Sequence, residues 1–318
     1  AGAAPRPAAK PEPVSPPSAV PRTTEKVDAP AERGRRLGTI KSWGYQLVDL
    51  DLEVAAASPF DLLVVDAVTG IEGDRPFTAK DVDLLKRKPG DSRRLLLAHF
   101  SIGEVDDNRA DLMSPEYLSE DAPEWLLHPN PRWKGSRYIR FCHEGWQRML
   151  LGDEHGNSVH NATEPAPLTR LIELGFDGVV LDRVGVYREL VKQCPDGENQ
   201  MVDLIGRIAT QARRRNPLFL VVVQNGEALA RQQRLVESID GVLREDLFTG
   251  PDSTPTAATT DAAIASLKRL KEAGRAVLVA DYTEQRSEAA AARRRILDQG
   301  FIPYVGPRDL GALWLPKP

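Results

Sequence analysis

Short apolar runs recur along this chain, and five of them end on a carboxylate. The runs lie at residues 62–65, 95–100, 179–181, 242–243 and 277–280, and the acids that follow them are Asp66, Glu104, Asp182, Glu245 and Asp281. A continuous apolar run of this length is typical of a parallel strand covered on both faces. Because α/β folds carry their reactive groups at the carboxyl ends of such strands, the pattern predicts a cleft lined with acids.

Between the apolar runs lie amphipathic segments, so strands and helices are expected to alternate. The predicted strands cover residues 44–48, 62–66, 95–100, 179–182, 218–224, 242–245, 277–281 and 301–305, and the predicted helices 165–174, 199–215, 261–273 and 287–298. Glycine or proline follows each of these helices, as at a helix end. Eight such units favour a (β/α)₈ TIM barrel, and an open doubly wound sheet is the alternative.

The third connection between a strand and its helix is unusually long. It contains a further strand-like run at 137–142, which we interpret as an added element, and it is rich in aromatic residues, including Trp125, Trp133 and Trp146. Aromatic rings stack on sugar faces as readily as they fill a core. The segment is therefore expected either to border a glycan groove or to form a hydrophobic plug under a long loop.

The first 36 residues are dominated by alanine and proline and show no apolar periodicity. We predict a disordered tether over residues 1–36 and one catalytic-size domain over 37–318. Such tethers commonly follow a removed signal or an anchor, so the protein is expected to be exported, to the periplasm, the cell surface or the medium. No apolar stretch is long enough to span a membrane.

Charge narrows the class of partner. Residues 1–36 carry seven basic and four acidic side chains, so of the net charge of −4 the rest of the chain carries −7. An acidic domain argues against a nucleic-acid partner and suits a cationic polymer, although solubility alone explains the same charge. Cys142 and Cys194 are too few for a zinc site or a disulfide scaffold, and either a pair or two buried thiols is compatible with the sequence.

Several catalytic signatures are missing, namely the Walker loop, Gly-x-Gly-x-x-Gly, His-Glu-x-x-His and Gly-x-Ser-x-Gly. The five histidines have no spacing typical of metal ligands. Carboxylate chemistry remains, since a glycosidase needs one protonated carboxyl group and one ionised carboxylate, which crowded acids can supply. Any single strand-end Asp could instead cap a helix, so the repeated pattern carries the prediction.

Seven segments together resemble glycoside hydrolase family 114, the endo-α-1,4-polygalactosaminidases. They lie in the family's order at residues 60–66, 101–104, 175–182, 224–227, 245–248, 281–282 and 300–304. The resemblance covers nearly the whole chain after the tether. It implies a TIM barrel that hydrolyses α-1,4-linked galactosamine or N-acetylgalactosamine polymers of biofilms, with retention of configuration and with neither cofactor nor metal.

The resemblance also implies roles for single residues. The nucleophile position falls on Asp182 and the general acid/base position on Glu245. Ring stacking is expected from Trp43 and Tyr282, and hydrogen bonds to the sugar from Gln224 and Asn225. The remaining acids are expected to bind hydroxyl groups or the ammonium of a deacetylated sugar; they are Asp66, Glu104, Glu227, Asp246 and Asp281.

One departure from the family pattern concerns Arg183, which follows the proposed nucleophile. Its charge would lower the pKa of Asp182 and would also repel a cationic sugar. A catalytically silent glycan-binding protein on the same barrel is therefore an alternative. A divalent-metal lyase or isomerase is disfavoured because no Lys or His base was identified at the strand ends. The protein is expected to act as a monomer.

Overall fold

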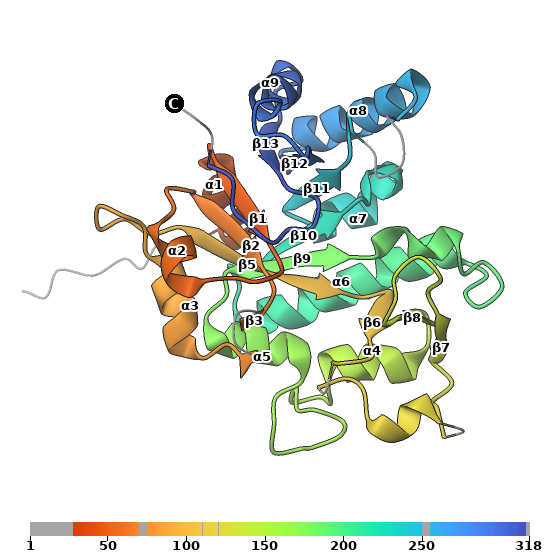
Figure 1. Ribbon diagram of the computed structural model, residues 1–318. Coiled ribbons are helices and arrows are strands. Elements are labelled where there is room, and N and C mark those ends of the chain that lie inside the picture. Colours follow the sequence, from red (N-terminus) through yellow and green to blue (C-terminus); the bar gives the residue numbers. More distant parts are fainter. Residues whose placement is uncertain (1–27, 70–74, 110, 120, 250–254, 316–318) are drawn as a thin grey trace, which may run out of the picture.

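Eight parallel strands form a single curved sheet around the centre of the molecule (Figure 1). The computed structural model describes residues 28–69, 75–109, 111–119, 121–249 and 255–315. In sheet order the strands are β1 (Trp43–Gln46), β2 (Leu62–Val65), β5 (Leu95–Ser101), β9 (Gly178–Asp182), β10 (Leu220–Gln224), β11 (Gly241–Glu245), β12 (Ala276–Tyr282) and β13 (Ile302–Gly306). All eight predicted strands are confirmed, with ends shifted by one or two residues.

Helices follow the strands and pack around the sheet, which gives the TIM-barrel fold predicted from the sequence (Figure 1). They are α1 (Ala29–Gly38), α2 (Leu52–Ala57), α3 (Ala79–Lys86), α4 (Glu144–Leu151), α5 (Pro167–Leu174), α6 (Gly197–Arg215), α7 (Gln233–Ser238), α8 (Ala257–Glu272) and α9 (Ala289–Asp298). Gly175 ends α5 in the left-handed conformation, as the sequence suggested. No described helix is long and apolar enough to cross a membrane.

The barrel is closed between its first and last strands by a side chain. The indole N–H of Trp43 on β1 donates to the carbonyl oxygen of Ile302 on β13 at 2.9 Å. The ring is fully buried and packs against Tyr45 and Tyr304. The prediction that Trp43 stacks on a sugar is therefore wrong, because its ring is part of the core.

The third connection carries an added layer, as predicted, and it is larger than one strand. β6 (Glu104–Asp106), β8 (Ser136–Ile139) and β7 (Leu126–Pro129) form an antiparallel sheet, followed by α4. Trp125 packs on Trp146 with 5.2 Å between ring centroids, and Trp146 donates to the carbonyl oxygen of Ile102. Both rings are buried and hold the loop to the barrel, whereas Trp133 is 63% exposed.

The remaining short elements lie in the connections. They are β3 (Val68–Thr69), β4 (Arg75–Pro76) and the 3₁₀ turns η1 (Pro115–Leu118), η2 (Val184–Arg188) and η3 (Glu227–Arg231). The turn η2 begins two residues after Asp182, the last residue of β9, and ends at Arg188.

The tether predicted over residues 1–36 extends too far, because the structure has the helix α1 from Ala29 to Gly38. Asp28 caps this helix. The Arg33 Nε lies 2.9 Å from Asp240, and the Arg36 guanidinium lies 2.5 Å from Asp177. Both acids precede strands and are buried, so these ion pairs hold α1 against the barrel. Composition gave no sign of these contacts because they join residues far apart in the chain. The rest of the tether, residues 1–27, lies outside the described residues.

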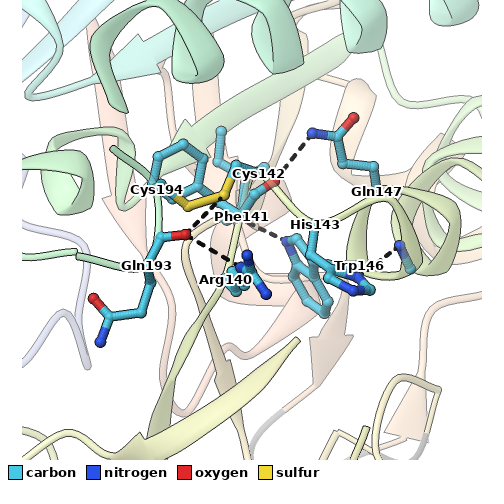
Figure 2. The surroundings of a disulfide bond; sticks show 10 residues. Arg140, Phe141, Cys142, His143, Trp146, Gln147, Gln193 and Cys194 are labelled. Atoms are coloured by element: carbon cyan, nitrogen blue, oxygen red, sulfur yellow. Dashed lines mark hydrogen bonds between the residues drawn. A yellow bond between two sulfur atoms is a disulfide. The ribbon is translucent and has the colours of Figure 1, made fainter. Parts of the chain in front are cut away.

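Cys142 and Cys194 form a disulfide bond, which settles the two alternatives left by the sequence. Figure 2 shows the bond joining the segment after β8 to the segment that leads into α6. Around it, Arg140 donates to the carbonyl oxygen of Gln193, and Gln147 donates to that of Phe141. The covalent bond therefore ties the added layer to the connection that follows β9.

Loss of this disulfide is expected to destabilise the protein by about 4 kcal/mol, because it closes a loop of 52 residues in the unfolded chain. Urea unfolding of the double variant Cys142→Ser/Cys194→Ser checks this against the oxidised protein. Reductant should lower the wild-type midpoint to that of the variant and leave the variant unchanged. An unchanged midpoint in both comparisons would contradict the prediction.

Candidate active site

Strand register brings two predicted acids to the same face of the sheet. Leu181 on β9 pairs with Val223 on β10, which places Asp182 level with Gln224. Gln224 pairs with Leu243 on β11, and Glu245 lies two residues beyond Leu243. Since side chains alternate along a strand, Asp182, Gln224 and Glu245 share one face. The amide of Gln224 therefore lies between the two carboxyl groups.

Glu245 is held by three donors. Its Oε2 accepts from Gln224 Nε2 at 2.7 Å and from Asn225 Nδ2 at 3.1 Å, and its Oε1 accepts from the Tyr282 hydroxyl. Burial raises the pKa of Glu245, and the negative charge of Asp182 raises it further, against the lowering effect of these hydrogen bonds. The net effect is a raised pKa, as a proton donor requires.

The phenol of Tyr45 fixes the orientation of the Gln224 amide. The Tyr45 hydroxyl on β1 donates to Gln224 Oε1 at 3.0 Å, which directs the Gln224 amide N–H groups toward Glu245. Burial, followed by the charges of Glu245 and Asp182, raises the pKa of Tyr45 well above its usual value. Tyr45 therefore keeps its proton and acts as a donor, which sets the orientation of Gln224.

Asp182 has the opposite environment. Its Oδ2 lies 3.1 Å from His99 Nε2, and its Oδ1 accepts from the backbone N–H of Arg183 at 2.6 Å. Burial alone would raise the pKa of Asp182, but the hydrogen bond and charge of His99, together with Arg183, lower it below its ordinary value. The pair thus consists of one carboxyl group that tends to stay protonated and one that tends to stay ionised.

The backbone is strained directly after each of the three strands that form this centre. Arg183, Asn225 and Asp246 have φ angles of 60°, 53° and 53°, in the left-handed region. Each follows one of the three central side chains. At Asn225 the conformation lets the side-chain oxygen accept from the Glu245 N–H at 2.9 Å while its amide donates to the Glu245 carboxylate. Strain of this kind concentrates at functional sites.

Comparison with known proteins agrees with the family that the sequence resembles and with the fold. Residues 23–315 match the glycoside hydrolase family GH114. The chain belongs to this family. An uncharacterized protein of Deinococcus radiodurans is 29% identical over 314 residues, which are 98% of this chain and 92% of that protein. Another, of Methanocaldococcus jannaschii, is 28% identical over 293 residues, covering 86% and 79%.

Among solved structures, the glycoside hydrolase domain of PelA from Pseudomonas aeruginosa superposes with a TM-score of 0.65. The match covers 86% of this chain and 97% of that domain at 17% sequence identity. At this identity the likeness concerns the fold. It agrees with the TIM barrel described above.

Two acids of the GH114 pattern support arginines. Both oxygens of Glu104 are engaged, by Asn130 at 2.7 Å, Ser136 at 3.0 Å and Arg183 at 2.5 Å. Glu227 binds Arg244 at 2.7 Å. Each acid is 6% exposed. The structure therefore does not place Glu104 and Glu227 as open sugar contacts, because they are buried behind Arg183 and Arg244.

Two further acids hold the loop after β11. Asp281 is fully buried, and its Oδ1 accepts from the Phe248 N–H and the Thr249 hydroxyl. Asp246 forms two hydrogen bonds with Arg308, at 2.7 and 3.2 Å, and the same guanidinium lies over the Tyr282 ring. Asp281 thus holds the loop after β11 through its Oδ1, and the Asp246–Arg308 pair supports the Tyr282 ring.

Asp66 remains open at the other side of the centre. Its Oδ1 accepts from the N–H of Ala67, and no ion pair joins it to a cation among the described residues. It follows β2, two strands from β9, and its charge acts on Tyr45 and His99. Of the five acids expected to bind sugar, Asp66 is the one that the geometry leaves free to do so.

Sequence reasoning missed His99, because the spacing of the five histidines indicated no site. It lies near the end of β5, and its neighbour across the sheet is Val180, so it faces the same side as Asp182. Burial lowers the pKa of His99, but Asp182 raises it by more, so the net shift is upward. The signal was a lone polar residue inside the apolar run 95–100.

Proposed function

We propose that this chain is a retaining, endo-acting glycoside hydrolase that cleaves α-1,4-linked exopolysaccharide rich in galactosamine or N-acetylgalactosamine. The observation that carries the proposal is the pair Asp182 and Glu245, which share one face of the barrel and have pKa shifts of opposite sign. Membership of GH114 supports the reaction class. The galactosamine polymer is the substrate that the family pattern implies.

In the first step, the ionised Asp182 carboxylate attacks the anomeric carbon. A bond forms between its oxygen and that carbon, the glycosidic bond breaks, and Glu245 gives its proton to the departing oxygen. In the second step, Glu245 takes a proton from water, whose oxygen displaces Asp182 from the anomeric carbon. Two inversions give net retention.

The positions of the supporting residues suit these roles. His99 and the Arg183 N–H each donate to Asp182, which keeps it ionised and oriented before attack. Tyr282, Gln224 and Asn225 hold Glu245 and can stabilise its ionised form after proton transfer. The disulfide supports the proposal that the protein works outside the cytoplasm, since such bonds persist in oxidising compartments.

The test uses an α-1,4-linked galactosamine polymer and an α-1,4-linked glucan of similar size as its control. Size analysis should show an early fall in the mass of the galactosamine polymer and no change in the glucan, as internal cleavage requires. Proton NMR during the first turnovers should show the α anomer. First appearance of the β anomer would exclude Asp182 as nucleophile, and binding without cleavage would favour the silent glycan-binding alternative.

A further inference from the structure

Arginines dominate the charged lining of a cavity beside the proposed catalytic pair. The cavity has a volume of about 370 Å³ and opens at the ends of β9, β10 and β11. Its lining residues are Arg132, Asp182, Arg183, Gly185, Arg188, Glu189, Gln224, Asn225, Arg244 and Glu245. Besides the catalytic pair, Glu189 is the one carboxylate in this lining, against four guanidinium groups.

Both carboxylate oxygens of Glu189 accept hydrogen bonds from side chains of the protein. Its Oε1 accepts from Arg183 at 3.0 Å, and its Oε2 accepts from Arg132 at 2.5 Å and from the Tyr138 hydroxyl at 2.7 Å. Arg183 also pairs with Glu104, and Arg244 pairs with Glu227. Both of these acids are buried. Apart from the catalytic pair, a ligand in this cavity therefore meets N–H donors and no acidic side chain without partners in the protein.

Arg188 is the most available of the four arginines. It is exposed at the end of η2, and its guanidinium lies over the Tyr187 ring, 5.1 Å from the centroid. The carboxylates near this cavity pair with other arginines, and no ion pair among the described residues involves Arg188. A group in the cavity can thus gain a guanidinium partner without breaking an existing ion pair.

We propose that this cavity is a sugar subsite for a ring that carries a carboxylate, so that the glycan bound across the site has mixed charge. The inference rests on the proposed function, which makes the cavity a subsite next to the cleaved bond. A planar guanidinium fits a carboxylate with two parallel hydrogen bonds, whereas it repels an ammonium. Apart from Glu245, the lining holds four positive and two negative side chains. Asp66, which follows β2 on the other side of β9 from the cavity, carries a negative charge that can bind an ammonium group of the same glycan.

The experiment compares two ligands that differ by charge alone. Trigalacturonate has the α-1,4 linkage and the galacto configuration of the proposed substrate, and its methyl ester is the uncharged match. Titration calorimetry on the wild-type protein at low salt is expected to give an affinity for the acid at least about tenfold higher than for the ester, the effect of one charge-assisted pair. The ratio should fall as salt rises.

Two charge reversals locate the effect. Arg188→Glu should abolish the preference for the acid, because it puts a negative charge at the cavity without removing an ion-pair partner. Arg294→Glu is the matched control on α9, outside the cavity lining, and should leave the ratio as in wild type. Thermal melting of both variants checks that they fold.

Equal affinity for acid and ester, binding of neither, or a preference that survives Arg188→Glu would each overturn the inference. Its failure is distinct from failure of the proposed function. Cleavage of a galactosamine polymer without any preference for the acid would leave the hydrolase in place and remove the carboxylate subsite. Selective, Arg188-dependent binding of the acid without cleavage of the galactosamine polymer would support the carboxylate subsite and contradict the proposed hydrolase.

Discussion

Replacing Asp182 with asparagine is expected to lower kcat by about 10⁴-fold or more, because the amide cannot form the glycosyl bond that splits the reaction into two steps. Asparagine keeps the shape and leaves the donors around it in place. Stopped assays of reducing ends released from the galactosamine polymer measure the loss. Activity within tenfold of wild type would exclude Asp182 as nucleophile.

Asp182→Gly sharpens this test. The smaller side chain leaves space at the anomeric carbon, so added azide should restore turnover of an activated glycoside and give the azide of inverted configuration. A matched control is His99→Gln, which keeps a donor beside Asp182 but removes the imidazolium charge. It should cost far less in kcat and should raise the pKa of Asp182, which moves the acid limb of the pH profile upward.

The carboxyl ends of the strands were predictable from sequence because burial on both faces requires apolar runs there. The runs at 62–65, 179–181 and 277–280 each became a strand of the barrel, and the register then placed Asp182 and Glu245 on one face. This part of the site follows from a local pattern and a regular architecture. The pattern marked both acids as strand-end carboxylates, and the resemblance to GH114 singled them out as the catalytic pair, which stays a prediction.

The separate roles of the other acids could not be predicted from the sequence, because each role depends on a partner that lies far away along the chain. Glu104 is bound by Arg183, and Asp281 is bound by the Thr249 hydroxyl, across connections whose course the sequence does not reveal. From sequence each of these acids is equivalent to Asp66. Only the fold shows that Glu104 and Asp281 are buried and bound by other parts of the chain, whereas Asp66 has no ion-pair partner among the described residues.

Cations around the site were missed for a related reason. His99 interrupts an apolar run, and Arg244 precedes the acid/base, so each was present in the analysed motifs without having a role. Their importance comes from the fold, since His99 on β5 shares a face with Asp182 on the neighbouring strand β9 and Arg244 lines the cavity. A search for polar residues on the inner face of each strand would have found His99, whereas Arg244 alternates with Glu245 along β11 and belongs to the opposite face.

Replacing Glu245 with glutamine is expected to lower kcat by about 10²–10⁴-fold, since the leaving oxygen then receives no proton from the protein. The wild-type rate should fall as pH rises through the pKa of Glu245, which burial and the charge of Asp182 place above its ordinary value of 4.5. The variant should lose this alkaline limb. Initial rates across the pH range measure both effects, and glycosides with good leaving groups should be affected least.

Tyr282→Phe is the matched change that keeps the acid but alters its titration. The Tyr282 hydroxyl donates to Glu245 and stabilises the ionised form, so its removal should raise the pKa of Glu245 and shift the alkaline limb to higher pH. The rate should fall less than in Glu245→Gln, because the proton is still supplied. An alkaline limb that persists in Glu245→Gln, or one that stays in place in Tyr282→Phe, would show that another group donates the proton.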